Sequence, residues 1–238
     1  MEITDDASAL EACERALHAL RTRPGGVPKR DLFALAKSST HLSPSLVERL
    51  LEREDHDARI VAVSIMDFQA RSGRLPDDVR RQLFELYLRR HDRIDTWDLV
   101  DRSAPYVVGG YLVDKPRDPL YRLAASDRWY ERRTSIVATY FFIRRGDLDD
   151  TFAIGELLAH DPHDLVQKAD GGWVREAGKR DRARLLGFLD RNAATMPRTA
   201  LRYALEHLDD ATRRHYLALA SSGDDSVSGR PPSRPKGG

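Results

Sequence analysis

The sequence predicts an all-α protein built from pairs of short helices. Apolar residues recur three and four positions apart in most segments, as on the buried side of an amphipathic helix. No segment shows the alternating pattern of a strand bounded by hairpin turns. The unit of helix, short turn and helix recurs about every 35 to 45 residues, which is typical of a helical solenoid. The repeat is one of hydrophobic pattern, because no repeated motif accompanies it.

Proline, glycine and capping residues divide the N-terminal half into helices. Pro24-Gly25-Gly26 ends the first helix, which carries Leu10 and Leu17 on its apolar side. Ser43-Pro44 is an N-cap followed by proline at the first helical position, and Gly73 ends a later helix. We therefore expect helices over residues 5–21, 32–37, 45–53, 56–71 and 76–90.

The C-terminal half continues the same pattern. Pro116 and Pro119 are expected to bend the chain ahead of a long helix that Gly146 ends. The expected helices span residues 129–145, 149–160, 182–191, 197–207 and 209–219, with a further helix that carries Trp173. They complete a single domain over residues 1–220. Residues 221–238 are rich in Gly, Ser, Pro and basic residues and lack an apolar stripe, so we expect a disordered tail there.

Composition excludes several classes of protein. The single Cys13 excludes an internal disulfide and a thiolate metal cluster, and it fits a reducing compartment. The longest apolar run, residues 136–143, is too short to span a bilayer. The first residues are acidic where a signal peptide would be basic. These features predict a cytoplasmic protein without a membrane partner.

The charge distribution is more informative than the net charge of +1. Arginine occurs in pairs at Arg80-Arg81, Arg89-Arg90, Arg132-Arg133, Arg144-Arg145 and Arg213-Arg214. If the helix ends that carry them converge, a nearly neutral chain presents a basic groove to phosphates. Each pair by itself fits a solvated helix surface better.

The stretch from Asp95 to Leu112 contains the residues of a candidate site. Thr96 can cap a short helix that begins at Trp97 and that Pro105 ends. Trp97 and Asp101 are four residues apart, so an aromatic face and a carboxylate share one side of this helix. Such a surface suits a sugar that develops positive charge, whereas the alternative is a half-buried tryptophan beside a structural aspartate.

Three ordered blocks resemble a known family. The first is Trp97-Asp-Leu-Val-Asp101-x-Ser-Ala-Pro, the second is Trp129-Tyr-Glu-Arg-Arg133-Thr-Ser-Ile-Val, and the third runs from His160 to Glu176. Together they resemble the AlkD-type DNA alkylation repair glycosylases over roughly residues 8 to 215. The resemblance implies a right-handed α-solenoid of HEAT-like repeats whose concave face grips DNA. It also implies an open groove that holds the lesion without flipping the base.

The resemblance assigns roles to individual residues. Asp101 matches the catalytic aspartate, whose charge would stabilise an oxocarbenium-like sugar and position a water. Asp98 and Asp95 are its competitors, although Asp98 is rotated by roughly 100° from Trp97 on a helix. Trp97 matches an aromatic wall of the cleft, and Arg133 matches an arginine that holds a backbone phosphate, with Arg132 assisting.

The third block departs from the family pattern. Members read Gln-Lys-Ala-x-Gly-Trp, whereas this chain places Gly172 where the tryptophan is expected and Trp173 one position later. Either the two adjacent glycines distort the helix, or the second aromatic wall is open. An open wall leaves room for a bulky adduct and equally fits a weakened enzyme. Lys168, Trp173 and Arg175 are expected to contact DNA.

The sequence therefore predicts a DNA glycosylase that excises cationic N3- or N7-alkylated purines from duplex DNA. We expect a monomer that needs no cofactor and associates with the nucleoid when bound to DNA. His160, Asp161 and His163 resemble metal ligands in type, but we do not expect a metal site, because a turn and cap over residues 161–164 explain Asp161 and Asp164 and no second cluster completes a coordination shell. The alternatives are a non-catalytic DNA-binding module of the same architecture and a protein-interaction scaffold.

Overall fold

A computed structural model describes residues 2–22 and 25–225, and every regular element in these ranges is a helix. The all-α prediction is thus confirmed. Packing divides the chain into two compact units, Met1–Asp147 and Leu148–Gly238. We call them unit 1 and unit 2. The right-handed solenoid and the single domain over residues 1–220 stay predictions.

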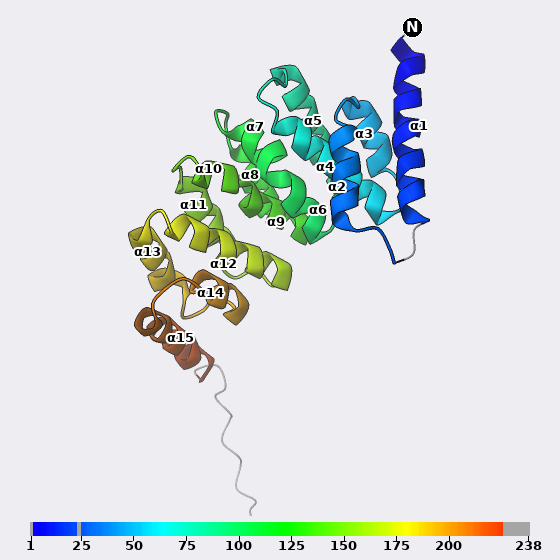
Figure 1. Ribbon diagram of the computed structural model, residues 1–238. Coiled ribbons are helices and arrows are strands. Elements are labelled where there is room, and N and C mark those ends of the chain that lie inside the picture. The colour runs from blue at the N-terminus through cyan, green and yellow to red at the C-terminus, as the bar shows by residue number, and fades with distance from the viewer. Residues whose placement is uncertain (1, 23–24, 226–238) are drawn as a thin grey trace, which may run out of the picture. The chain divides into compact units, whose positions relative to one another are not determined.

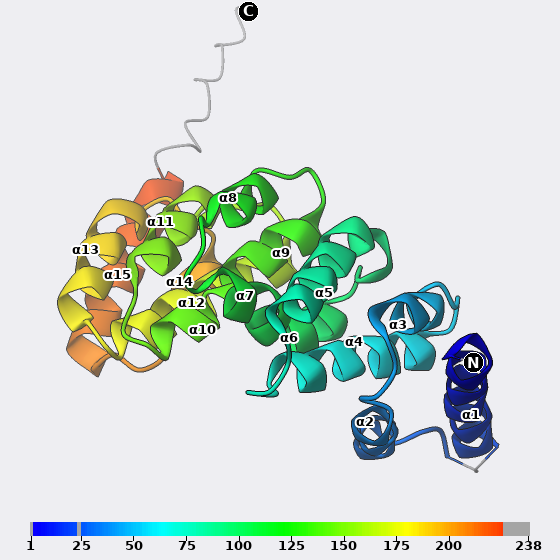
Figure 2. The same ribbon diagram turned by 90° about the horizontal axis from the view of Figure 1, so that it is seen from above.

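Unit 1 consists of two layers of helices (Figures 1 and 2). One layer contains α2, α4, α6 and α9, each in contact with the next, and the other contains α1, α3 and α5. The helices of unit 1 are α1 (Glu2–Arg21), α2 (Lys29–Ser38), α3 (Pro44–Leu51), α4 (His56–Ala70), α5 (Asp77–Arg89), η1 (His91–Arg93), α6 (Trp97–Ser103), η2 (Ala104–Gly109), α7 (Gly110–Leu112), α8 (Asp118–Ala124), α9 (Trp129–Ala138) and α10 (Tyr140–Ile143).

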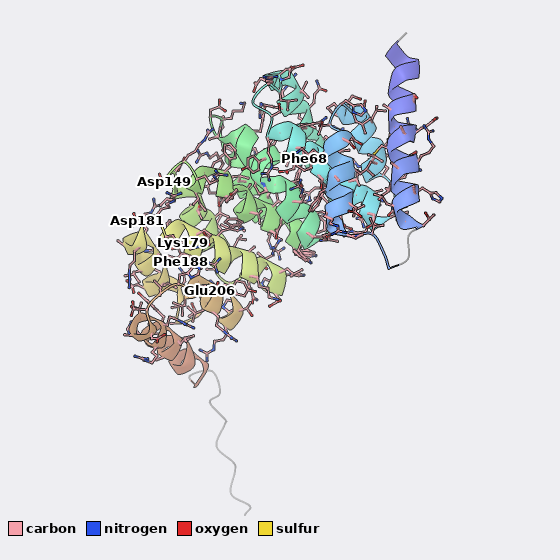
Figure 3. The ribbon with its side chains drawn as sticks, in the orientation of Figure 1. Phe68, Asp149, Lys179, Asp181, Phe188 and Glu206 are labelled. Atoms are coloured by element: carbon pink, nitrogen blue, oxygen red, sulfur yellow. The ribbon has the colours of Figure 1, made fainter. Side chains whose placement is uncertain are left out.

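Unit 2 is built around α12, which contacts α11, α13 and α14. Its helices are α11 (Asp149–Leu158), α12 (Asp164–Gly178), α13 (Arg182–Asn192), α14 (Arg198–Ala204) and α15 (Asp210–Asp225). Phe188, labelled in Figure 3, is fully buried at the centre of this unit with Val174 and Leu201. No helix in the described ranges of either unit is long and apolar enough to cross a bilayer.

The last helix extends further than the apolar pattern predicts. The tail was expected from residue 221, but α15 continues to Asp225. Helix propagation adds one backbone hydrogen bond per residue and needs no apolar stripe once a helix has formed. The rest of the predicted tail, residues 226–238, lies outside the described residues.

Pro105 does not end the helix that begins at Trp97. The chain passes from α6 directly into η2, a π-helix, and then into α7, so residues 97–112 form one helical rod. In an α-helix the N–H of residue 105 would bond the carbonyl of Asp101, and proline has no N–H. The wider π register, in which Gly110 N–H bonds the Pro105 carbonyl, keeps the chain helical past the proline.

Pro119 begins a helix instead of bending the chain. It lies in the first turn of α8, where a backbone N–H has no partner within the helix and its loss costs little. The sequence pattern did not predict α8, because the two prolines were interpreted as a bend in the chain.

The long helix expected over residues 129–145 is interrupted at Thr139, between α9 and α10. Both the amide and the hydroxyl of Thr139 bond the carbonyl of Ile136, at 3.2 and 2.7 Å. This three-residue spacing breaks the α-helical register for one turn.

Close packing at Gly109 brings the 97–112 rod against α9. A Cβ atom at this position would lie 2.1 Å from the carbonyl oxygen of Ala138. Because the neighbouring atom belongs to the backbone, no side-chain rotation relieves the overlap. The absence of a side chain at Gly109 is therefore what lets η2 approach the end of α9 closely.

Replacement of Gly109 by alanine is expected to destabilise the protein by about 1–3 kcal/mol, the cost of overpacking a rigid contact. The matched control is Gly172→Ala, because a Cβ at Gly172 meets nothing within 4 Å. Alanine there should stabilise by about 0.5–1 kcal/mol through its helix propensity. Urea unfolding followed by circular dichroism measures both. A Gly109→Ala protein as stable as the wild type would contradict the close approach.

Candidate active site

Asp101 and Arg133 form an ion pair that joins α6 to α9. Arg133 Nε donates to Asp101 Oδ1 at 2.9 Å, and Arg133 Nη2 donates to Asp101 Oδ2 at 2.8 Å. Two parallel hydrogen bonds fix the plane of the carboxylate as well as its position. The structure thus brings together two residues that the sequence analysis assigned to one site.

The two partners differ in exposure. The side chain of Asp101 is 37% exposed, whereas that of Arg133 is 9% exposed. The guanidinium therefore lies behind the carboxylate, which faces solvent. A ligand can reach Asp101 while Arg133 continues to hold it. The expectation that Arg133 binds a phosphate stays a prediction, since in this structure its guanidinium donates two hydrogen bonds to Asp101.

Trp97 lies at the start of α6 with 49% of its surface exposed. It is four residues from Asp101, so both side chains project from the same side of the helix. Lys29, from the beginning of α2, places its ammonium 5.5 Å from the centre of the indole ring. The site surface therefore combines an aromatic face, a carboxylate and a cation. Sequence analysis missed Lys29, and no local pattern marks a residue so distant in the chain.

Asp98, a competitor for the catalytic role, has a structural environment. Lys29 Nζ donates to Asp98 Oδ2 at 2.8 Å, Thr96 Oγ1 donates to Oδ1 at 2.7 Å, and His56 Nε2 lies 3.1 Å from Oδ2. Burial opposes ionisation, but these hydrogen bonds outweigh it and hold the pKa of Asp98 well below its usual range. Asp98 therefore ties α2 and α4 to the start of α6. Thr96 occupies the N-cap as predicted, but its hydroxyl bonds Asp98 instead of a backbone amide.

Asp95, the other competitor, lies before α6. Arg59 Nη1 donates to Asp95 Oδ1 at 2.6 Å and to the carbonyl of Arg93 at 3.3 Å. The Asp95 side chain is 39% exposed, which is close to the exposure of Asp101. Exposure and arginine pairing therefore do not separate the two. What distinguishes Asp101 is its place on the Trp97 side of α6.

A buried polar network lies beside the ion pair. Thr134, the residue after Arg133, has its hydroxyl 3.0 Å from the Tyr87 hydroxyl and 2.9 Å from His91 Nε2. Burial raises the pKa of Tyr87 and lowers that of His91, so both groups are neutral at physiological pH. The network links α5 and η1 to α9 and thereby fixes the helix that carries Arg133.

Arg102 anchors α6 from the opposite side. Its guanidinium lies 4.6 Å from the ring centres of both Phe33 and Phe68, the latter labelled in Figure 3. Arg102 Nε also donates to Ser64 Oγ at 3.1 Å, and Nη2 lies 3.1 Å from the buried Asp67 carboxylate. This packing connects α2, α4 and α6 immediately after Asp101. The sequence analysis did not predict these contacts of Arg102.

Arg132, expected to assist Arg133, lies in a different environment. Its Nη1 donates to the carbonyls of Ser126 and Asp127 at 2.9 and 3.0 Å. It therefore holds the turn that precedes α9. A role for Arg132 in DNA binding stays a prediction.

Three further predicted DNA contacts lie on α12 in unit 2. Lys168 pairs with Asp164 at 2.5 Å, and Arg175 pairs with Glu176 at 3.0 Å and with Glu206, which is labelled in Figure 3. Trp173 is partly exposed. Both cations thus have carboxylate partners in the protein without DNA.

The glycine pair on α12 does not distort the helix. Residues 164–178 are α-helical throughout, so Trp173 is turned by about 100° from position 172. Gly171 is needed where it stands, because a Cβ there would lie 2.2 Å from the carbonyl oxygen of Ala200. Gly172 instead faces open space. Of the two alternatives from the sequence, the structure favours an open position at Gly172.

Residues 160–163 form the turn and cap before α12, as interpreted from the sequence. His163 is the N-cap and its Nδ1 accepts from Leu165 N–H at 3.3 Å, while Asp161 Oδ1 accepts from His163 N–H at 2.8 Å. His160 Nε2 lies 2.8 Å from Thr195 Oγ1. Among the residues that the structure describes, no three His, Cys, Asp or Glu side chains gather in a way that would hold a metal ion.

Asp170, also on α12, is a fully buried carboxyl group. Neither of its oxygens has a hydrogen-bond partner in the structure, and Gly155 lies directly beside it. Burial, with the negative charges of Asp161 and Glu156, raises the pKa of Asp170 well above its usual value. The folded protein therefore holds this group as a neutral acid. In the unfolded chain it ionises above about pH 4.

This difference makes the stability of the protein pH-dependent. Because the folded state retains a proton that the unfolded state loses, stability falls as pH rises between the two pKa values, by up to about 1.4 kcal/mol per pH unit. Asp170→Asn removes the titration, so the variant should gain stability over the wild type as pH increases from 5 to 8. Asp210→Asn, which replaces an exposed carboxyl in the same unit, is the control. Thermal unfolding at pH 5 and pH 8 measures the stability of each protein. If the stabilities of the wild type and Asp170→Asn change in parallel between the two pH values, Asp170 is not a neutral acid in the folded protein.

Comparison with known proteins identifies the family. A family model described as DNA alkylation repair enzyme matches residues 14–208 of the 238. Searches of curated proteins and of solved structures found no significant match. The matched range includes Trp97, Asp101, Arg133 and all of α12. The resemblance inferred from three sequence blocks is thereby confirmed, and the chain belongs to the DNA alkylation repair enzyme family.

Proposed function

We propose that this protein is a DNA glycosylase that removes cationic N3- or N7-alkylated purines from duplex DNA. Its family supports a role in the repair of alkylated DNA. The observation that carries the finer proposal is the exposed Asp101 carboxylate, fixed in two hydrogen bonds by Arg133 beside the exposed Trp97.

Hydrolysis of this glycosidic bond requires little catalysis beyond stabilisation of the positive charge that develops on the sugar. An alkylated purine with a positive ring is a good leaving group, so no acid is needed to protonate it. The bond between C1′ and the base nitrogen breaks, its electron pair goes to the base, and the base leaves neutral. Positive charge then develops on the sugar, where a carboxylate is most stabilising. Water adds to C1′ and releases one proton, giving an abasic site.

Asp101, Trp97 and Arg133 have different roles in this scheme. Asp101 stabilises the cationic sugar and accepts a hydrogen bond from the attacking water. Trp97 lies against the sugar, and its ring face favours positive charge there. Arg133 is a positioning residue, because its bidentate contact holds the carboxylate in one orientation before the substrate arrives.

We place the lesion against the exposed surface of α6 and propose that the base is not flipped. Trp97 and the Asp101 carboxylate are both accessible from solvent. Extrusion of a base costs a few kcal/mol in lost pairing and stacking. An exposed site that reads the sugar does not require this cost, since its contacts are with the backbone side of the nucleotide.

The residues of unit 2 extend the contact with DNA in this proposal. Lys168 and Arg175 exchange their carboxylate partners for phosphates, and Trp173 packs against the duplex. Gly172 adds no side chain to α12 at the position where the family pattern has tryptophan. A preference for bulky adducts is thus part of the proposal.

The same glycine favours a second candidate function, a non-catalytic module that binds alkylated or distorted duplex DNA. A residue with no side chain cannot form an aromatic wall at position 172. Such a module would bind duplex DNA with strong salt dependence but would release no base.

Base release from alkylated duplex DNA tests the proposal. One substrate carries methyl adducts and the other a bulky minor-groove adenine adduct. Asp101→Asn should lower the single-turnover rate constant by about 100-fold or more, because the charge is lost while the shape remains. Asp95→Asn is the matched control, with similar exposure and its own arginine partner, and should retain activity. If the wild type binds both duplexes and releases no base, catalysis is refuted and the binding module remains.

A further inference from the structure

A concave surface in unit 1 lies at the end of the 97–112 rod that is opposite Trp97. It is a groove of about 400 Å³ between α4, α5, η2, α7 and α10, and we call it the η2 groove. Its lining includes Arg71, Arg80, Tyr106, Lys115, Phe141 and Arg145. None of these residues takes part in the Asp101 site.

The η2 groove carries an excess of positive charge. Four of its lining residues are cationic, and two, Asp77 and Asp114, are carboxylates. Both carboxylates lie close to Lys115, at 3.8 and 2.9 Å from its ammonium. Of the cations, Arg71 also pairs with the buried Asp67 at 2.8 Å, and Arg80 donates to the carbonyls of Ala70 and Ser72. Within the described residues, no carboxylate oxygen lies within 4 Å of the Arg145 guanidinium. Its charge is therefore available to an anion.

Aromatic rings hold the cations in place. The guanidinium carbon of Arg71 lies 3.8 Å from the ring centre of Tyr106, and that of Arg145 lies 4.7 Å from the ring centre of Phe141. The ammonium of Lys115 lies 4.5 Å from the ring centre of Tyr111. Cations held in this way lose less conformational entropy when an anion binds. Because the cations cover these ring faces, the groove fits a phosphate better than a stacked nucleobase.

Arg144 adds a cation at the rim. Its Nη1 donates to the Tyr106 hydroxyl at 3.0 Å and to the Tyr140 hydroxyl at 3.4 Å. Both contacts are with neutral oxygens, so the positive charge is not balanced by them. Arg144 and Arg145 form one of the arginine pairs noted in the sequence, and both are exposed.

The rod sets the distance between the groove and the catalytic carboxylate. Asp101 and Gly110 are nine residues apart on it, which corresponds to about 14 Å at a rise of about 1.5 Å per residue. Duplex DNA advances about 3.4 Å per base pair, so this distance spans about four base pairs. The separation along the rod is therefore within the length of one short duplex.

We infer that the η2 groove binds the phosphodiester backbone of the same duplex, a few base pairs from the lesion. The inference rests on the proposed function for its choice of duplex DNA as the ligand. The groove supplies affinity and register on the DNA, whereas Asp101 supplies the chemistry. Removal of the groove cations should consequently weaken binding without slowing the bond-breaking step.

The test compares the double variant Arg144→Gln/Arg145→Gln with the wild type in binding an undamaged duplex over a series of salt concentrations. Loss of the groove contacts should weaken binding about 10-fold or more near 0.1 M salt. It should also reduce the magnitude of the slope of log K against log salt concentration by about 1 to 2. The control is Arg49→Gln/Arg122→Gln, which removes two exposed arginines from α3 and α8 of the same unit. It should lose much less affinity. Thermal unfolding verifies that both variants are folded.

The outcomes separate this inference from the proposed function. If the groove variant binds with unchanged affinity and slope while the wild type binds DNA, the inference is wrong and the proposed function stands. If the variant binds more weakly but at saturating protein releases alkylated base at the wild-type single-turnover rate, both are supported. If the wild type does not bind duplex DNA at all, both are wrong. Saturable binding of inorganic phosphate at micromolar concentration, lost in the groove variant, would instead identify a small-anion site and overturn the inference.

Discussion

The ion pair between Asp101 and Arg133 is the interaction on which the site depends. A guanidinium that is 9% exposed is costly to remove from water, and its two hydrogen bonds to Asp101 offset part of that cost. The pair joins α6 to α9, and the rod that begins with α6 also packs closely against the end of α9 at Gly109, which has no side chain to meet the Ala138 carbonyl. Thr134 and its partners Tyr87 and His91 then hold α9 from within the core. The exposed carboxylate is thus the outer end of a rigid buried arrangement, which is the preorganisation that electrostatic catalysis requires.

The π-helical turn after α6 lets the same rod position a second surface, the η2 groove. A helix ended by Pro105 would present Asp101 near a loop, whereas η2 continues the rod to Leu112 and carries Tyr106 into a basic groove. The proline and the glycine of this segment therefore act together, since one sets the π register and the other permits the contact with α9. A single continuous element positions both the carboxylate and the surface that we infer to hold the DNA backbone. Reading the lesion through its sugar and phosphates does not depend on a pocket for the base.

The sequence predicted the helical class, most helix positions and the pairing of Trp97 with Asp101, because these depend on local periodicity and spacing. It also predicted that Arg133 belongs to the same site, through the family resemblance. It did not predict the contacts of Lys29, Arg102 or Tyr87, since each joins helices that are far apart in the chain. Pro105 and Pro119 were misread because proline ends a helix in its interior but is tolerated in a π turn or a first turn, and local pattern does not distinguish these cases. The sequence also did not predict the burial of Asp170, since burial of a lone carboxyl follows from packing and not from its neighbours in sequence.

A double-mutant cycle on Asp101 and Arg133 tests whether the arginine acts by orienting the carboxylate. Single-turnover base release would be measured for the wild type, Asp101→Asn, Arg133→Lys and the double variant, all verified to be folded. If Arg133 acts by orienting the carboxylate, Arg133→Lys should slow the wild type but have little further effect once Asp101 is Asn. Effects that multiply independently would show that the two residues act separately and would contradict the account.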